Sequence, residues 1–440
     1  MTIGLCGYAS YLPHHRLAGS AIGLRRGDRV VASYDEDSTT MAVAAAARAL
    51  PSDVVPDALY LATSTPAYAD KTNATAVHAA LGLPVEVFTA DMCGTARSAM
   101  AGLRADVRVG RPGSADEKSG GDGAAALWFG ADDPIAEVLA IRSSTAEFLD
   151  RWRSPDEATG QLWEERFGAE FYAELIRDTA GAALAASGCA DVDHVVLTCP
   201  NTAVLKRAAT LVKGQKSVSS SPIGHSGAAD PFIALAGILD IAEAGDTIMV
   251  VSAADGCDVV VFAATAALGR HRQSRPLSAQ RAAGSAVEYL TYLSWRGLVE
   301  REAPRRPEPD RPAAPPAGRA RQWKFGLVGS CCKECGFVHL PPQRVCRQCQ
   351  ATDEMAEVAV RDLAGTVVTY TVDRLAFSPS PPMVQAVIDI DGGGRCTLEV
   401  ADARPDELAV GTRVRFTFRR LFTAGGVHDY FWKAVQVDAQ

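Results

Sequence analysis

The stretch CKECGFVHLPPQRVCRQC, residues 332–349, decides the fold of the C-terminal third of the chain. It contains two C-x-x-C pairs with ten residues between them. Each pair offers two thiolates from one tight turn, and four thiolates complete the tetrahedron that Zn²⁺ prefers. Redox-active or free cysteines are the alternative, but this spacing favours a zinc ribbon. The predicted ligands are Cys332, Cys335, Cys346 and Cys349, and the adjacent Cys331 would enter if the register shifted by one residue.

Four protein ligands leave no open coordination position, so we expect the zinc to be structural rather than catalytic. Beyond the ribbon, short strand-like runs are separated by Gly, Pro and Asp turns: GTVVTYTV, MVQAVIDI, RCTLEV, TRVRFTF and FWKAVQV. Five such strands predict a small β-barrel of the OB-fold type. The ribbon is expected to cover residues 321–355 and the barrel residues 356–440.

Before the ribbon, residues 299–320 read VEREAPRRPEPDRPAAPPAGRA. This Pro- and Arg-rich composition predicts a semi-rigid, extended linker, and a helix-like segment precedes it. Residues 286–320 therefore separate the ribbon from a large N-terminal region, residues 1–285.

The N-terminal region alternates Ala-rich helical stretches with short apolar strands, which predicts a layered α/β fold. It also looks duplicated, with halves of about 1–165 and 166–285. A strand ending in Thr63 precedes Asp122-Gly123 by nearly the same distance as one ending in Thr198 precedes Asp255-Gly256. Each pair encloses a small-residue turn that opens a helix, in DMCGTARSAMAGL and PIGHSGAADPFIALAGIL. Chance similarity of generic α/β segments is the alternative explanation.

Composition excludes several classes of function. The chain has 44 Lys and Arg against 52 Asp and Glu, a net charge of -8, which argues against nucleic-acid or anionic-membrane binding. A nucleic-acid role for the barrel is disfavoured for the same reason. No apolar run reaches the length of a membrane span and no export signal is evident, so we expect a cytoplasmic protein. Its eleven cysteines are then expected to be thiols and metal ligands rather than disulfides.

Several segments together resemble a known combination of domains. They are GYASYLPHHRL, YDEDSTTMAVAAAARAL, TPAYADKTNATAVHAALGLP, GGDGAAALWFG, FLDRWR, WEERF, GHSGAADP, the ribbon and RRLFTAGGVHDYFWKA. The chain resembles a thiolase-superfamily domain of the hydroxymethylglutaryl-CoA synthase type, fused to the zinc-ribbon and OB-fold domain that accompanies acyl-CoA thiolases. The resemblance implies a duplicated α-β-α-β-α fold, a CoA or acyl-carrier thioester as substrate, and a homodimer.

The resemblance also implies an active site that this chain has largely lost. The family's acyl-accepting Cys lies five residues after an acidic residue, and counting from Asp91 leads to Ala96. Ala cannot form an acyl-enzyme. The second-half His falls on Thr198, and the general acid/base Glu falls on Ser64. Only the third polar position keeps a useful group, as His225.

Three side chains near this site remain candidates. Cys93 would be a substitute nucleophile if a helix N-terminus favours its thiolate, although we favour a buried packing role. His225 would act as a general base or donate to a thioester carbonyl, or it would only satisfy backbone groups. Arg97 would hold a substrate anion or, as we favour, pair with a carboxylate such as Asp91.

We predict structural roles, or no role, for the remaining polar residues. Cys199 is expected to pack in the core, and Asp122 and Asp255 to close Gly turns. A further loop holds Tyr68, Lys71 and Asn73, to which we assign no role. Counted as catalytic are thus His225, Cys93 and Thr198, and counted as substrate-binding are Ala96, Arg97 and Ser64.

Three functions fit these residues. The first is an acyltransferase or C–C bond-forming enzyme that acts on a bound thioester without the usual Cys. The second is an aldol-type lyase in the same fold, which needs only a general acid/base. The third is an inactive thioester-binding scaffold for partner enzymes, assembled as a homodimer or with another acyl-CoA enzyme.

Overall fold

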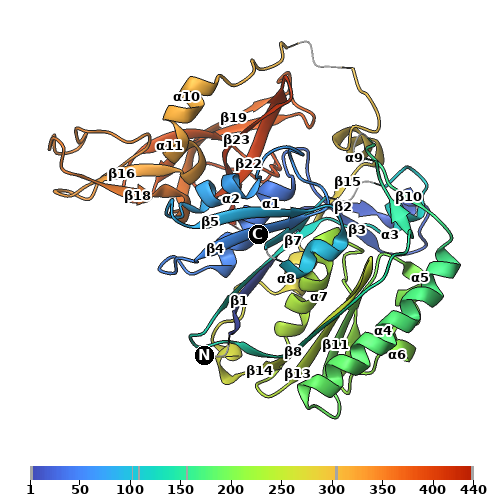
Figure 1. Cartoon of the computed structure of the whole chain (residues 1–440). Coiled ribbons are helices and arrows are strands. Elements are labelled where there is room, and N and C mark those ends of the chain that lie inside the picture. The colour runs from blue at the N-terminus through green and yellow to red at the C-terminus, as the bar shows by residue number, and fades with distance from the viewer. Residues whose placement is uncertain (1–2, 102, 108–109, 155–156, 303–305, 438–440) are drawn as a thin grey trace. The chain divides into compact units, whose positions relative to one another are not determined.

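The computed structural model describes residues 3–101, 103–107, 110–154, 157–302 and 306–437. These residues cluster into two compact units, whose elements Figure 1 labels. Unit 1 comprises the chain up to Ala32, Asp37–Ala74 and Val87–Tyr289. Unit 2 comprises Ser33–Glu36, Thr75–Glu86 and the chain from Leu290 onwards. Two short segments that the sequence places in the N-terminal region thus cluster with the C-terminal residues.

A ten-stranded sheet runs through the described part of unit 1, in the order β12-β11-β13-β14-β8-β1-β7-β6-β4-β5. The first-half strands are β1 (Gly4–Tyr11), β4 (Ala58–Thr63), β5 (Phe88–Cys93), β6 (Leu103–Asp106) and β7 (Gly123–Gly130). The second-half strands are β8 (Ala136–Thr145), β11 (His194–Thr198), β12 (Ser217–Ser219), β13 (Thr247–Ala253) and β14 (Gly256–Ala264).

The two halves have the same strand order. When the five strands of a half are numbered along the chain, their order across the sheet is third, second, fourth, fifth, first in both halves. The pairings of the second strand are parallel, and the other two are antiparallel, in both halves. The halves meet where β1 pairs with β8 through Gly4–Glu137 and Leu5–Ala136. The predicted duplicated α/β fold is confirmed.

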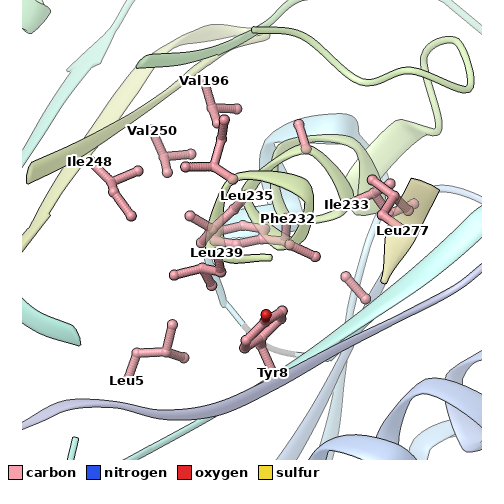
Figure 2. Close-up of a cluster of buried hydrophobic side chains, with 14 of the residues drawn as sticks. Leu5, Tyr8, Val196, Phe232, Ile233, Leu235, Leu239, Ile248, Val250 and Leu277 are labelled. Carbon is pink, nitrogen blue, oxygen red and sulfur yellow. The ribbon is translucent and has the colours of Figure 1, made fainter. Parts of the chain in front are cut away.

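Alternate side chains of the second-half strands enter two different cores. Val196 and Val250 lie beside helix α7 (Asp230–Leu239) in the core that Figure 2 shows, and Phe262 of β14 belongs to the same core. Their neighbours Leu197, Val251 and Val261 share the other core with helix α4 (Glu165–Ser187). These strands are apolar on both faces because helices cover both.

Helix α7 lies at the centre of the first core. Its apolar side chains meet β1 and β7 of the first half as well as β11 and β13 of the second. Pro231 fits its first turn, where no backbone N–H needs an intrahelical acceptor. Helix α1 (Ser38–Ala49) packs on β1 and β7 and starts at a capping box, in which Asp37 Oδ1 accepts from Thr40 N at 2.9 Å.

The other elements of unit 1 are short. They are β2 (His15–Ala18), β3 (Asp28–Val31), β9 (Arg151–Trp152), β10 (Gln161–Leu162), β15 (Ser285–Val287), η1 (Gly19–Ile22), η2 (Ala96–Ala101), η3 (Gly227–Ala229), η4 (Ala266–Gly269), α3 (Ala115–Ser119), α5 (Thr202–Leu205), α6 (Ala208–Leu211), α8 (Leu277–Ala282) and the start of α9 (Tyr289–Trp295). Across the described residues, no helix combines the length and apolarity that a membrane crossing requires.

Unit 2 contains a three-stranded ribbon and a five-stranded barrel. The ribbon strands are β16 (Val328–Cys332), β17 (Val338–His339) and β18 (Met355–Ala359), and η5 (Val360–Asp362) leads onward. The barrel strands are β19 (Gly365–Asp373), β20 (Met383–Ile390), β21 (Arg395–Glu399), β22 (Arg413–Ala424) and β23 (Val427–Gln436). Their order is β21-β20-β19-β22-β23, and a parallel bridge from Val400 to Ala434 closes it. The predicted OB-type barrel is confirmed.

The Pro- and Arg-rich segment before the ribbon, which lies in unit 2, is less extended than its composition predicts. Residues 314–319 form helix α10 (Ala314–Arg319), which α11 (Arg321–Gly326) follows. Pro315 and Pro316 stand in the first turn of α10, where a missing N–H costs no helical hydrogen bond. Helix α2 (Ala74–Leu81) belongs to unit 2 from Thr75 onwards.

Two glycine-containing loops of unit 1 lie against each other, one from each half. The N–H of His225 donates to Ser119 O at 2.7 Å, and the N–H of Gly121 donates to His225 O at 3.1 Å. A Cβ on Gly121 would lie 2.1 Å from the carbonyl oxygen of Ile223. The motifs GGDGAA and GHSGAA therefore need glycine because backbone meets backbone here.

We expect Gly224→Ala to destabilise unit 1 by at least about 2 kcal/mol. Gly224 has a φ of +93°, and an added Cβ would lie 2.6 Å from Ser119 O. Gly181→Ala is the matched control, because Gly181 is exposed within α4 and nothing lies within 4 Å of its added Cβ. Urea unfolding measures both variants, and equal midpoints would contradict the close packing of the two loops.

Candidate functional site

The turn after β5 contains Ala96, where the sequence resemblance predicts the family's nucleophile position. Ala96 begins η2, a six-residue 3-10 helix, whereas the equivalent place in the second half carries η3 and the ten-residue α7. η2 packs against η3, so the turns from the two halves are neighbours. Ala96, to which the resemblance assigns the nucleophile position, contributes only a methyl group to this turn.

Cys93 ends β5 and is exposed. The prediction that it packs in the core is wrong, because β5 is the edge strand of the sheet and its last residue is not covered. The expected α-helix N-terminus is also absent from this turn, since η2 is a short 3-10 helix. Thiolate formation at Cys93 thus lacks the helix dipole that the sequence suggested.

Arg97 connects the turn to the second half. Its Nε and Nη2 donate to the two carboxylate oxygens of Asp258 at 2.9 and 3.2 Å. Nη1 donates to Asp255 O at 2.7 Å and Nη2 to Thr145 Oγ1 at 2.8 Å. The favoured ion-pair role is found, but with Asp258 in place of Asp91. With these donors engaged, the guanidinium is not placed to hold a substrate anion.

Asp91 has a different task. It accepts from the N–H of Asn73 at 2.6 Å and from the N–H of Ala74 at 2.7 Å, and so caps the start of α2. Asn73 in turn bonds the backbone of Tyr68 and Lys71, which folds the polar loop on itself. These residues have structural contacts, consistent with assigning them no chemical role.

Thr198 and Ser64 lie at the ends of equivalent strands of the two halves, β11 and β4. Thr198 ends β11, is buried, and donates its hydroxyl to Val251 O at 3.4 Å. Ser64 follows β4, and its carbonyl accepts from Arg153 Nη2 at 3.3 Å. Next to Thr198, Cys199 is buried as expected, and burial raises the pKa of its thiol to about 12. The raised pKa disfavours the reactive thiolate of Cys199 at neutral pH.

His225 stands between β12 and η3 with 8% of its surface exposed. Its Nδ1 accepts from the N–H of Gly227 at 2.9 Å. In the neutral imidazole the proton then belongs on Nε2, which makes that atom a donor. The carboxylate of Asp230 lies 3.9 Å from Nδ1 and accepts from Ser226 N at 3.0 Å. The hydrogen bond from Gly227 N–H fixes the orientation of the His225 ring.

The two Asp-Gly turns have structural roles. Asp122 is buried, and its carboxylate accepts from Ala32 N at 2.7 Å. Asp255 has a φ of +50° in the tight turn between β13 and β14, and its carbonyl accepts from Arg97. Both act on backbone conformation, as the sequence suggested.

The four ribbon cysteines come together in unit 2. The sulfur atoms of Cys332, Cys335, Cys346 and Cys349 lie within 4.8 Å of one another. Cys332 and Cys349 are 3.6 Å apart, and Cys335 and Cys346 are 3.5 Å apart. A tetrahedral site with Zn–S bonds of about 2.3 Å has sulfurs about 3.8 Å apart, so the spacing fits zinc. Cys331 lies outside this group, with its sulfur 3.4 Å from Gly336 O.

Electrostatics of the cluster also favour a bound cation. Burial opposes ionisation of Cys346, but backbone N–H groups of Cys349 and Gln348 donate to its sulfur and its pKa falls to about 5. A backbone hydrogen bond at Phe337 favours the Cys335 thiolate, yet desolvation and the neighbouring sulfurs raise its pKa to about 12. Four thiolates this close repel one another unless a cation neutralises them.

The sequence pattern did not identify Asp258 or the charged residues around Arg419 and Lys433 as candidates. Asp258 is a carboxylate in the otherwise apolar strand GCDVVVFAA, and that contrast was the available signal. Nothing in the sequence pattern identifies its partner, because Arg97 lies on the other half of the duplicated fold.

Known proteins match the two parts of the chain separately. A family described as the ChsH2 rubredoxin-like zinc ribbon domain matches residues 326–355, and the ChsH2 C-terminal OB-fold domain matches residues 357–419. A DUF35 domain-containing scaffold protein of Methanocaldococcus jannaschii is 32% identical over 123 residues, which cover 26% of this chain and 86% of that protein.

The N-terminal part matches other proteins. A hydroxymethylglutaryl-CoA synthase of Picrophilus torridus is 28% identical over 344 residues, covering 67% of this chain and 97% of the relative. A solved structure of HMG-CoA synthase complexed with CoA has the same fold, with a TM-score of 0.59 and 16% identity. It covers 66% of this chain and 89% of the other.

The fold is therefore a thiolase-like domain, similar to that of HMG-CoA synthases, fused to a zinc ribbon and an OB-fold. Through this C-terminal part the chain belongs to the family of DUF35 domain-containing proteins. The resemblance seen in the sequence is confirmed.

We expect one zinc ion per chain, and we expect Cys346→Ala to lose it together with several kcal/mol of stability in unit 2. Cys331→Ala is the control and should keep the metal, because its sulfur lies outside the four-sulfur group. Elemental analysis and thermal unfolding of protein purified under reducing conditions measure both. Native protein without zinc, or a Cys331→Ala variant that loses it, would contradict the assignment.

Proposed function

We propose that this chain binds an acyl-CoA or acyl-carrier thioester and transforms it without an acyl-enzyme at the family's cysteine position. The reaction class is acyl transfer, or formation or cleavage of a C–C bond. Support comes from the likeness to HMG-CoA synthases over two thirds of the chain and from the solved relative that carries CoA.

One observation carries the proposal. Ala96 replaces the nucleophile, while the neighbouring turn keeps His225 in a fixed orientation. The fixed ring favours a role as a donor over a role as a mobile general base. Retention of a donor beside a missing nucleophile favours chemistry on the bound thioester itself.

His225 would act through its Nε2–H. Gly227 N–H occupies Nδ1, so in the neutral ring Nε2 carries the proton, and this buried atom would donate to the thioester carbonyl when substrate is bound. Negative charge develops on that oxygen in acyl transfer and in aldol-type cleavage, and a fixed donor stabilises it. Of the two roles considered from the sequence, donation therefore fits better than general-base catalysis.

Arg97 would position the turn instead of binding substrate. Its bidentate pair with Asp258 holds the residue next to Ala96 against strand β14. Asp255 O and Thr145 Oγ1 fix the same guanidinium from the second half. The turn would thus keep its shape although no α-helix follows it.

A second candidate function is a scaffold that holds an acyl thioester for partner enzymes. The missing nucleophile favours it, as does the likeness of the C-terminal part to a protein described as a scaffold. The partner would be another acyl-CoA enzyme. In both candidates the zinc is structural, because four cysteines fill its coordination.

Incubation with acetyl-CoA, isobutyryl-CoA and benzoyl-CoA, followed by intact-mass analysis, is expected to leave the protein without an acyl adduct. Product formation, followed by liquid chromatography and mass spectrometry, should fall about 10²- to 10³-fold in His225→Gln because an oxyanion donor is lost. His271→Gln is the matched control. The side chain of His271 is exposed, and its ion pair is with the exposed Asp133.

The outcomes separate the candidates. An adduct that disappears in Cys93→Ala would establish a covalent route and overturn the proposal. Thioester binding by both the native protein and His225→Gln, with no turnover by either, would instead support the scaffold.

We also propose that the chain forms a homodimer through strand β5. This strand lies at the edge of the sheet, and Phe88 and Met92 on it are 58% and 41% exposed. An exposed edge with large apolar side chains is suited to pairing with a second copy. Light scattering should give the mass of a dimer, and Met92→Lys should give a monomer. Ile141→Lys, on an inner strand, should not change the mass, and a monomeric native protein would contradict the proposal.

A further inference from the structure

Two cations are buried in the OB-fold barrel of unit 2. Lys433 on β23 is fully buried, and Arg419 on β22 is 3% exposed. A buried cation is costly unless carboxylates and hydrogen bonds surround it. The question is which groups provide this compensation.

The barrel itself provides one carboxylate for each cation. Lys433 Nζ lies 2.6 Å from Glu399 Oε1, and Arg419 Nη2 lies 2.8 Å from Asp402 Oδ2. Each cation thus has one partner that is close to it in sequence or on a neighbouring strand.

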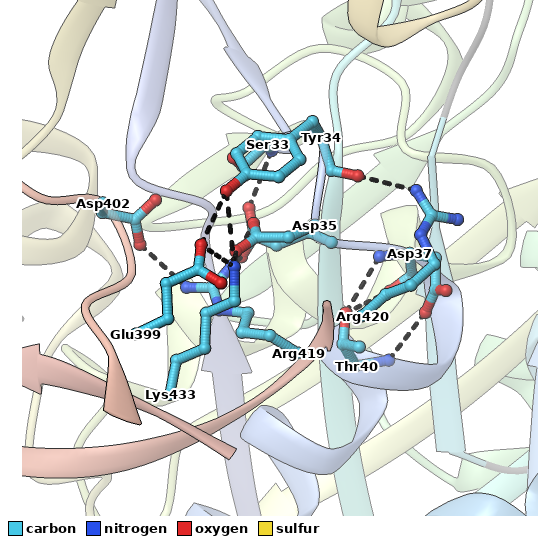
Figure 3. A network of polar contacts seen from close by, with 11 residues as sticks. Ser33, Tyr34, Asp35, Asp37, Thr40, Glu399, Asp402, Arg419, Arg420 and Lys433 are labelled. Atoms are coloured by element: carbon cyan, nitrogen blue, oxygen red, sulfur yellow. Dashed lines mark hydrogen bonds and ion pairs between the residues drawn. The ribbon is translucent and has the colours of Figure 1, made fainter. Parts of the chain in front are cut away.

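Each cation has a second carboxylate partner, which comes from the distant segment Ser33–Glu36 (Figure 3). Asp35 Oδ2 lies 2.8 Å from Lys433 Nζ, and Glu36 forms an ion pair with Arg419. Both acidic side chains are buried. Despite this burial, Lys433 and Arg419 keep the pKa of Asp35 below its usual range, so it stays ionised.

The segment is also held through its backbone and its aromatic ring. Arg420 N donates to Asp35 O at 2.9 Å, and Arg420 Nη2 donates to Tyr34 O at 2.7 Å. Tyr34 Oη donates to Glu399 at 3.0 Å, and the ammonium of Lys433 lies 5.1 Å from the centre of the Tyr34 ring. Every residue from Tyr34 to Glu36 therefore has its own set of contacts on the barrel.

We propose that the OB-fold carries a recognition site for an acidic peptide of the pattern aromatic-Asp-Glu, and that Tyr34–Glu36 of this same chain is its ligand. Lys433 reads the aromatic ring and the first carboxylate, Arg419 reads the second, and Arg420 holds the backbone. This site is independent of the chemistry proposed for His225.

The chain enters unit 2 at Ser33 and leaves it after Glu36. The peptide is therefore a tether in addition to the covalent linker, and it should keep its hold when the linker is cut. Because the ion pairs are buried, moderate salt should weaken it little.

The test uses the full chain with a specific protease site inserted between Arg306 and Arg311. After cleavage, the two fragments should remain together on size exclusion. Asp35→Asn combined with Glu36→Gln should weaken their association at least tenfold, measured by dilution of a fluorescently labelled fragment. Asp389→Asn combined with Asp391→Asn is the matched control, because these acids form exposed pairs with Arg395 and Arg413.

A competition experiment needs no variant and covers the case in which the substituted chain fails to fold. Excess peptide ASYDEDS, the sequence of residues 32–38, should speed the dissociation of the fragments, which Thr75–Glu86 also joins, whereas ASYNQDS should not. Equal affinity of the double variant and its control, or equal effects of the two peptides, would overturn the proposal. In chains that also carry Met92→Lys, mixed with different tags before cleavage, recovery of the N-terminal fragment of one chain with the C-terminal fragment of another would assign the ligand to a second copy and overturn the assignment within one chain.

Discussion

The thiolase-like unit depends on the burial of helix α7 between strands from both halves. Phe232, Leu235 and Leu239 pack with residues of β1, β11 and β13, so neither half has this core without the other. Burying apolar side chains on one shared helix makes the duplicated halves a single cooperative structure. The pairing of β1 with β8 and the contact between the two glycine loops then fix the halves in register.

The halves are equal in their strands but not in their helices. The second half has α7 after its third strand, whereas the first has only the six-residue η2. Ala96 begins η2, and the next residue, Arg97, joins this turn to Asp258 of the second half. In the proposed function, Ala96 stands at the family's nucleophile position and His225 donates to the bound thioester.

Unit 2 shows a similar dependence on residues from elsewhere in the chain. The ribbon depends on four cysteines close in sequence, and a metal ion would hold them together. The barrel depends on a segment hundreds of residues earlier, because Arg419 and Lys433 would otherwise each lose a buried partner. Local sequence is sufficient for the first kind of stabilisation and insufficient for the second.

The sequence by itself determined the elements that rest on local pattern: the C-x-x-C spacing of the ribbon, the five barrel strands and the two similar α/β halves. These follow from short-range periodicity and spacing, which a chain displays before it folds. Only the tertiary structure decided that Cys93 is exposed at a sheet edge, that Arg97 pairs with Asp258 and that Tyr34–Glu36 fills a site on the barrel. Burial and ion pairing join residues that are distant along the chain, and no local pattern encodes which distant groups will meet.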